Sequence, residues 1–259
     1  MEKGIRLDEN YISQVIFRIE FPTIKKLTGN DKGVVKDFAN KISGTFPILE
    51  VIPHNKINLD IDINSGQPPK ITREGDLVWI FKSQNNKKIV TLTANDLVLE
   101  YREKVYSGFT NFLDEILLLM GAFNQFDYQK LNFLGLRYIN QITDKNVNNN
   151  VSEFFSPDLT NMAIINNLEK NNENLVQIFT KVNFKKDDYL MTMQYGLFNP
   201  RFPNVDADKM FILDYDCVLH NISHVEEIKD NLIDMNHLIF DKFDNYFFKD
   251  NLHYNFSEF

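Results

Sequence analysis

The sequence predicts an α+β protein built around one mainly antiparallel sheet, and three observations support this prediction. Several segments alternate apolar and polar residues, as strands with one buried face do. Residues 105–123 and 224–248 repeat apolar residues at helical spacing. The element order of residues 11–128 returns in residues 131–248. We therefore expect two β-α-β-β-β-α pseudo-repeats that share one sheet, with the long helices packed on one face.

The first pseudo-repeat opens with alternation over residues 11–21, which predicts a strand. Apolar spacing then predicts a helix over 33–46, closed by Gly44 and Pro47. The same alternation predicts strands at 48–52, 57–63, 77–82, 89–93 and 97–101. A helix over 105–123 completes this half.

The second pseudo-repeat is recognised by two short matches. Phe17-Arg18-Ile19 matches Leu136-Arg137-Tyr138 at an offset of 119, and Asp96-Leu97-Val98-Leu99-Glu100 matches Asp216-Cys217-Val218-Leu219-His220 at an offset of 120. The same shift moves the first helix onto residues 152–165. Agreement in both offset and element order indicates one domain over residues 1–259.

The rest of this half follows the same logic. Strands are expected at 175–184 and 189–198, on either side of a charged turn. The closing helix over 224–248 begins with Ser223 and Glu226, a capping-box pair. Pro157 limits how regular the helix over 152–165 can be.

The amino-acid composition argues against several classes of protein. The net charge is −8, and residues 131–259 carry all of it, with 11 Lys+Arg against 19 Asp+Glu, so broad nucleic-acid binding is not expected. The single cysteine, Cys217, excludes an internal disulfide and a cysteine-based zinc site, which favours the cytoplasm. Residues 1–10 lack the apolar core of a signal peptide, and the apolar run over 116–123 is too short to cross a membrane.

Strand alternation places two arginines and two aspartates on one sheet face. Arg18 and Arg137 point away from their apolar neighbours, and so do Asp96 and Asp216. These four either pair as Arg–Asp bridges that fix strand register, or form a polar groove for an anionic or peptide ligand. Tyr138 and Asn140 join them as candidate ligand-binding residues, although both lie on the other side of their strand.

A second cluster offers possible metal ligands. Asp214 and Asp216 are two residues apart on a strand, so they share a face, and His220 follows on the same segment. Paired carboxylates of this kind hold Mg²⁺ in nucleases and phosphotransferases. The competing interpretation is a solvated strand end followed by a helix cap. No Walker-type loop, Rossmann glycine pattern or nucleophile elbow occurs, and we predict no cofactor.

Four short motifs resemble those of a sporadically distributed, uncharacterised bacterial protein family of about this length. They are Glu20-Phe21-Pro22, Tyr106 with Phe109, Gly135-Leu136-Arg137-Tyr138-Ile139-Asn140, and Leu213-Asp214-Tyr215-Asp216. The similarity covers nearly the whole chain. It implies no activity, and the patchy distribution of the family implies mobile or defence-associated genes.

These observations favour a non-enzymatic binding or adaptor protein, because a complete fold pattern carries no catalytic constellation. The expected partner is a protein or a small anionic ligand, with homodimerisation as a secondary prediction. The alternative is a metal-dependent enzyme acting on nucleic acid or nucleotide, with Asp214 and Asp216 as ligands and Arg137 holding phosphate. Sequence-tolerant nucleic-acid binding is a third hypothesis, which the acidic second half disfavours.

Overall fold

The computed structural model describes residues 11–29, 31–60, 70–126, 128, 130–142, 176–204, 210–222 and 225–247. Within these residues nine strands form one antiparallel sheet in the order β2-β3-β4-β5-β1-β6-β9-β8-β7. The strands are β1 (Ile12–Glu20), β2 (Ile48–Asp60), β3 (Lys70–Lys82), β4 (Lys88–Leu92), β5 (Asp96–Arg102), β6 (Leu131–Ile142), β7 (Ile178–Lys186), β8 (Tyr189–Phe198) and β9 (Met210–Ile222). The α+β class and the single antiparallel sheet are confirmed.

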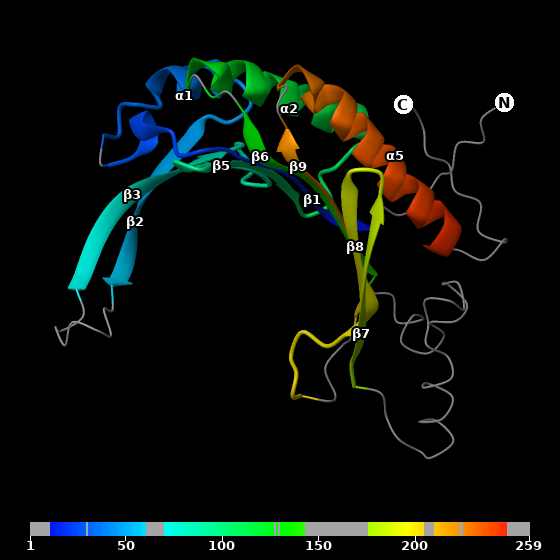
Figure 1. The fold of residues 1–259 in the computed structure, drawn as a ribbon. Helices are drawn as coiled ribbons and strands as arrows, with labels where there is room; N and C mark the ends of the chain where they lie inside the picture. The colour runs from blue at the N-terminus through cyan, green and yellow to red at the C-terminus, as the bar shows by residue number, and fades with distance from the viewer. Residues whose placement is uncertain are drawn as a thin grey trace, which may run out of the picture.

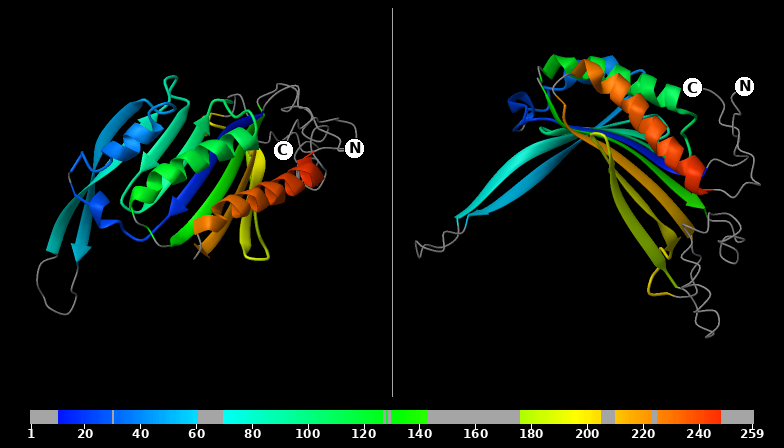
Figure 2. Two further views of the ribbon diagram at one scale, coloured as in Figure 1. Left: turned by 90° about the horizontal axis from the view of Figure 1, so that it is seen from above. Right: turned by 45° about the vertical axis from the view of Figure 1, so that its right-hand side comes forward.

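The sheet is arched. In Figure 1 its centre, where β1 and β6 pair, forms the top of the arch, while β2 and β3 descend at one end and β7 and β8 at the other. Figure 2 shows the same arch from two further directions. The strand predicted at 48–52 and residues 57–60 of the strand predicted at 57–63 are parts of one strand, β2, which pairs with β3 along its whole length. Residues 61–63 lie outside the described residues.

Strand alternation sorts the side chains of the sheet into two faces. One face, called here the buried face, carries core residues that are completely inaccessible, including Val15, Phe17, Leu99, Leu136 and Tyr215. The other, the half-exposed face, carries Arg18, Glu100, Arg137, Asp216 and Thr192, all partly accessible. This contrast is what alternating apolar and polar residues produce when one side of a sheet packs into a core.

Three α-helices lie among the described residues: α1 (Lys36–Ile42), α2 (Phe109–Phe123) and α5 (Ile228–Phe247). In Figure 1 all three lie above the arch, and α2 contacts both α1 and α5. The predicted start of α2 at residue 105 is four residues early. Glu103, Lys104 and Gly108 have positive φ, so the chain turns there before the helix begins.

Some predicted elements lie outside the described residues. These are the helix over 152–165, the N-terminal segment 1–10 and the cap residue Ser223. Residues 225–227 form a short 3-10 turn ahead of α5. Within the described part of the chain, no helix combines the length and apolar character needed to cross a membrane.

Candidate binding face

Arg137 and Asp214 form a bidentate ion pair on the half-exposed face. Arg137 Nε donates to Asp214 Oδ1 at 2.8 Å, and Nη2 donates to Oδ2 at 2.6 Å. The Asp214 side chain is 7% exposed, whereas that of Arg137 is 37% exposed. These hydrogen bonds raise the pKa of Arg137 further. A planar guanidinium that meets a carboxylate with two parallel bonds has a fixed orientation, so this pair is a rigid feature of the face.

Arg18 makes the corresponding contacts in the first half of the chain. Its Nη2 lies 2.8 Å from Glu20 Oε1 and 3.4 Å from Asp96 Oδ1. The predicted Arg–Asp bridge therefore exists for Arg18 and Asp96. These side chains are 46%, 39% and 26% exposed for Arg18, Glu20 and Asp96, so the contacts are weaker than the Arg137 pair.

Strand register decides which aspartate each arginine binds. Arg137 faces Asp216 directly, yet it binds Asp214, two residues away along β9. Arg18 faces Val98 and contacts Asp96, again two residues away along the neighbouring strand. The geometric counterpart of Asp96 is thus Asp214. The prediction that Arg18 and Arg137 form bridges with Asp96 and Asp216 is therefore wrong for Arg137, which binds Asp214 because the two strand pairs differ in register by two residues.

Asp216 is left beside this pair without a bond of its own. No hydrogen bond or ion pair joins its carboxyl to another residue in the described ranges. Burial is the main influence on the carboxyl and raises its pKa. By smaller amounts, Arg137 lowers the pKa, Asp214 raises it, and Lys181 and Arg18 lower it. Asp216 is not among the described residues whose fully buried polar atoms lack a partner, so water reaches its carboxyl oxygens.

Polar residues of β8 and β7 continue the face beyond Asp216. Thr192 faces Asp216 and donates through its hydroxyl to Asn183 Oδ1 at 2.8 Å. Gln194 faces Asp214, and its Nε2 lies 3.5 Å from Asp214 Oδ2. Neither Thr192 nor Gln194 was predicted from the sequence to belong to a site. In the sequence, both residues alternate with the buried residues of β8. This alternation predicts the face on which they lie but does not predict that they take part in binding.

Tyr138 and Asn140 belong to the buried face, so the six candidate ligand-binding residues do not form one site. The Tyr138 hydroxyl donates to Asn236 Oδ1 of α5 at 2.8 Å and lies 3.2 Å from the Tyr106 hydroxyl. Burial raises the pKa of Tyr138 well above its ordinary value. Asn140 is 2% exposed, and its Nδ2 donates to the carbonyl of Leu213. Both residues connect elements of the core.

The predicted metal ligands are not brought together. Asp214 gives both carboxylate oxygens to Arg137, and exposed His220 lies against the ring of Phe133, with centroids 5.5 Å apart. Across the described residues, no three His, Cys, Asp or Glu side chains form a group that could hold a metal ion. Cys217 is completely buried, and this burial raises the pKa of its thiol to about 12.

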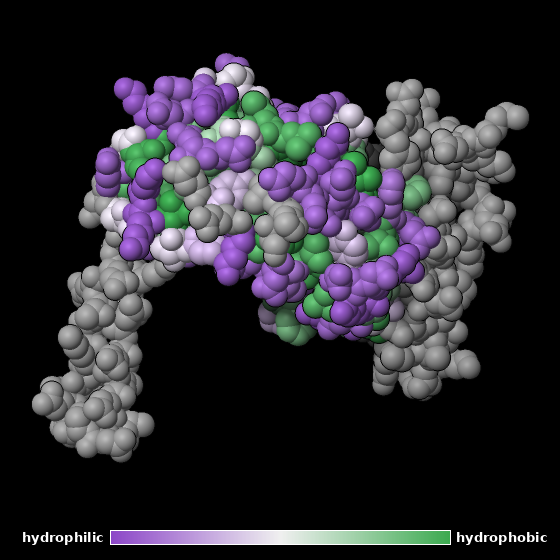
Figure 3. Space-filling model, turned by 45° about the horizontal axis from the view of Figure 1, so that its top comes forward, coloured by the Kyte–Doolittle hydropathy of each residue, from purple (hydrophilic) through white to green (hydrophobic). Residues whose placement is uncertain are grey.

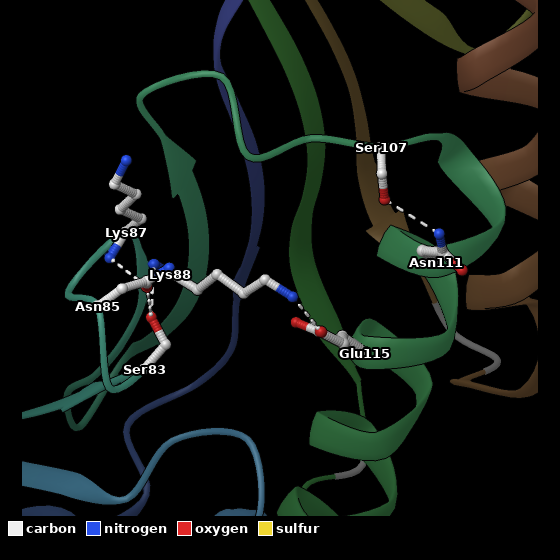
Figure 4. A network of polar contacts seen from close by, with 7 residues as sticks. All are labelled: Ser83, Asn85, Lys87, Lys88, Ser107, Asn111 and Glu115. Carbon is white, nitrogen blue, oxygen red and sulfur yellow. Dashed lines mark hydrogen bonds and ion pairs between the residues drawn. The ribbon is translucent and has the colours of Figure 1, made fainter.

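A second polar cluster, which was not predicted from the sequence, joins β4 to α2. Figure 4 shows the Lys88 side chain reaching from β4 to Glu115 of α2, where Nζ and Oε1 are 2.5 Å apart. The same ammonium lies 4.6 Å from the ring centroid of Tyr101, whose pKa is raised, chiefly by burial. Lys88 alternates with Val90 and Leu92, so a lysine on an apolar face was the available signal. This cluster fastens α2 to the sheet.

No family model matches the sequence, and no curated protein matches it either. The resemblance to a sporadic bacterial family therefore stays a prediction.

Proposed function

We propose that this chain is a non-enzymatic binding or adaptor protein that docks a protein partner on the half-exposed face of its sheet. The observation that carries the proposal is the unbonded carboxyl of Asp216, held beside the rigid Arg137–Asp214 pair. A donor supplied by a partner, such as a lysine, an arginine or a backbone amide, would replace the water that reaches this carboxyl. Ile16 and Ile139, partly exposed on the same face, would add apolar contact area.

The other ligand classes gain less support from these contacts. A small anion or a phosphate would need the guanidinium of Arg137, and Asp214 already accepts hydrogen bonds from two of its nitrogens. A metal-dependent enzyme would need Asp214 as a metal ligand, and the same two bonds occupy both of its oxygens. A polypeptide partner could bind while Arg137 and Asp214 remain paired with each other.

We also propose that two related halves of the chain form this face, and that the long helices pack on the opposite side of the sheet. In support, the strand order β3-β4-β5-β1 in one half has the same form as β7-β8-β9-β6 in the other. Each half also ends with a helix after its last strand, α2 after β5 and α5 after β9. In Figure 3 the side that carries the helices shows mostly hydrophilic residues with hydrophobic ones between them, as a solvated layer would.

Site-specific photo-crosslinking in the native cells tests the proposal. A benzophenone amino acid at Thr192 would sample the half-exposed face, and the same amino acid at the exposed Asp114 of α2 would sample the helix side. We expect a defined protein adduct from the Thr192 position that is absent from the Asp114 position. D216N, which removes the carboxylate charge and keeps the shape, should reduce that adduct strongly.

Equal adducts from both positions, or an adduct that D216N leaves unchanged, would contradict the proposal. Circular dichroism of D216N would show that the variant is folded, so that a lost adduct reports on binding. Homodimerisation stays a separate prediction, and light scattering over micromolar concentrations tests it. Residence in the cytoplasm likewise remains proposed.

A further inference from the structure

Strand β7 is the edge strand at one end of the sheet, next to β8. It pairs with β8 along all nine of its residues, and within the described ranges no strand pairs with its other edge. Figure 1 labels β7 at this end of the arch. Every second residue of such an edge directs its N–H and C=O outward, which is the arrangement that pairs with an added strand.

The charge of β7 is opposite to that of the chain around it. The strand carries Lys181, Lys185 and Lys186, all exposed, and contains no acidic residue. It lies in the half of the chain that holds the entire charge excess of −8. An edge of this composition attracts a segment rich in Asp and Glu.

Apolar groups accompany these charges on both faces of the strand. Phe179 is 44% exposed and shares its face with Lys181 and Lys185, while Val182 is 38% exposed on the other face. Leu190, which faces Lys185 on β8, is 41% exposed. An added strand with alternating side chains would therefore find apolar contacts on either side of the sheet.

Two other possibilities fit the edges of the sheet less well. The opposite edge strand, β2, contains Pro53, which has no N–H to donate to an added strand. Two copies of this chain paired through β7 would place two sets of three lysines on neighbouring strands, and like charges across a strand pair are destabilising.

We propose that the outer edge of β7 binds an extended acidic segment of a protein partner by strand addition, so that this segment becomes the tenth strand of the sheet. Lys181 and Lys185 pair with its carboxylates on the half-exposed face. This inference rests on the proposed function for the partner being a protein, and adds the chemistry and backbone conformation of its contacting segment. Asn183 and Thr192 connect the added strand to Asp216.

Fluorescence anisotropy with synthetic peptides tests the inference on the full chain. The probe is a labelled peptide of about ten alternating Glu and Val residues, long enough to match a typical strand. We expect it to bind, and a Lys–Val peptide of equal length not to bind. Two further Glu–Val peptides carry N-methyl amides, one at odd and one at even positions. Strand addition predicts that one of these two fails to bind, because only one set of N–H groups faces β7.

Charge-reversal variants locate the site. K181E/K185E should weaken binding of the Glu–Val peptide at least about tenfold, because two favourable contacts become repulsive. The matched control K36E/K41E reverses two exposed lysines of α1 and should leave the affinity unchanged within about twofold. Thermal melting of both variants shows that each is folded.

Three results would overturn the inference: no binding of the Glu–Val peptide, equal binding of both N-methylated peptides, or an oligonucleotide that binds more tightly than the peptide and depends on Lys181 and Lys185. Its failure is separable from failure of the proposed function. Crosslinks from Thr192 that depend on Asp216 and survive K181E/K185E would keep the binding face and reject the edge. Peptide binding at β7 without crosslinks from Thr192 would keep the edge site and reject the binding face.

Discussion

Arg137 holds the nearly buried carboxylate of Asp214 through two hydrogen bonds. Replacing Arg137 with alanine leaves that carboxylate without its partner in a place that excludes most water. We expect R137A to lower the free energy of unfolding by about 2–3 kcal/mol. This is less than the cost of breaking a fully buried pair, since Arg137 is 37% exposed. Urea unfolding monitored by circular dichroism measures the change.

R18A is the matched control, because Arg18 occupies a similar place in the first half with more exposed partners. We expect a loss below about 1 kcal/mol, as is usual for exposed ion pairs. Equal losses for the two variants would mean that burial of Asp214 does not set the strength of its ion pair.

The carboxyl of Asp216 makes stability depend on pH. Because its pKa is raised, mainly by burial, the folded protein holds this proton more tightly than the unfolded chain does. The stabilisation is present below the ordinary value of 3.8 and is lost as pH rises through the higher folded-state pKa.

We therefore expect the free energy of unfolding of D216N to rise relative to that of the wild type as the pH increases from 3.8 through the raised pKa of Asp216. Denaturant titrations at several pH values measure this difference. D114N, which changes an exposed aspartate of α2, should follow the wild type throughout. A difference between D216N and wild type that does not vary with pH would exclude a raised pKa.

Tyr138 connects three elements through its hydroxyl. Because it donates to Asn236 of α5, the Tyr106 hydroxyl must act as the donor in the contact between the two tyrosines. Y138F leaves Asn236 Oδ1 without this bond and should cost about 1–2 kcal/mol in denaturant unfolding. Y189F removes a half-exposed hydroxyl bonded to Asn231 and should cost less. The opposite ranking would show that Tyr138 does not stabilise the core.

Residue identities in the candidate site were predictable only in part. Alternation correctly placed Arg18, Arg137 and Asp216 on the same face, because a period of two is a local property of a strand. It could not reveal that Arg137 binds Asp214, since that choice depends on the register between β6 and β9. Register arises from pairing between residues far apart in sequence.

Among the secondary-structure elements, the pairing of β7 with β8 depends on one glycine. Gly196 has φ of +149°, and a Cβ at this position would lie 2.0 Å from the carbonyl oxygen of Ile178. We expect G196A to separate part of β7 from β8 and to cost at least about 2 kcal/mol. Hydrogen exchange should show lost protection in β7 with β1 and β6 still protected.

G44A provides the control for this change. A Cβ at Gly44 meets nothing within 4 Å, and its φ is not positive, so stability and exchange should be close to those of the wild type. Retained protection of β7 in G196A would mean that the strands adjust to the extra methyl group.

Strands were easier to predict than the ends of elements. The expected segments at 89–93, 97–101 and 189–198 agree with β4, β5 and β8 within one residue, because their alternation is regular. The length of β2 was missed because Pro53 and the following polar residues weaken the pattern, while pairing with β3 extends the strand. In β2, pairing with a neighbouring strand outweighed the low strand propensity of the local sequence.

For the whole molecule, one apolar core includes residues from both halves of the chain. It contains Phe17 and Leu99 from the first half together with Leu136, Tyr215 and Leu232 from the second. We expect thermal unfolding in one transition, with a calorimetric enthalpy equal to the van't Hoff enthalpy. Two separate transitions would show that the halves are independent domains and would reject the single-domain prediction.

The sequence predicted the class of the whole molecule and the joining of its strands into one antiparallel sheet. It could not predict the arch, whose shape comes from the accumulated twist of nine strands. Because of that twist, the half-exposed face lies on the concave side of the arch. Its potential as a docking surface was therefore visible in the sequence only as a set of polar alternating residues.

The position of β1 between β5 and β6 also has a consequence for synthesis on the ribosome. β1 can pair with β5 once Arg102 has been made, but its other edge waits for β6, which ends at Ile142. At ordinary translation rates these about 40 residues take roughly 2–8 s. During that interval the nascent chain presents a central strand as a temporary edge, with Phe17 and Ile19 not yet covered by the second half. A nascent-chain chaperone that binds apolar strands would have its natural target there.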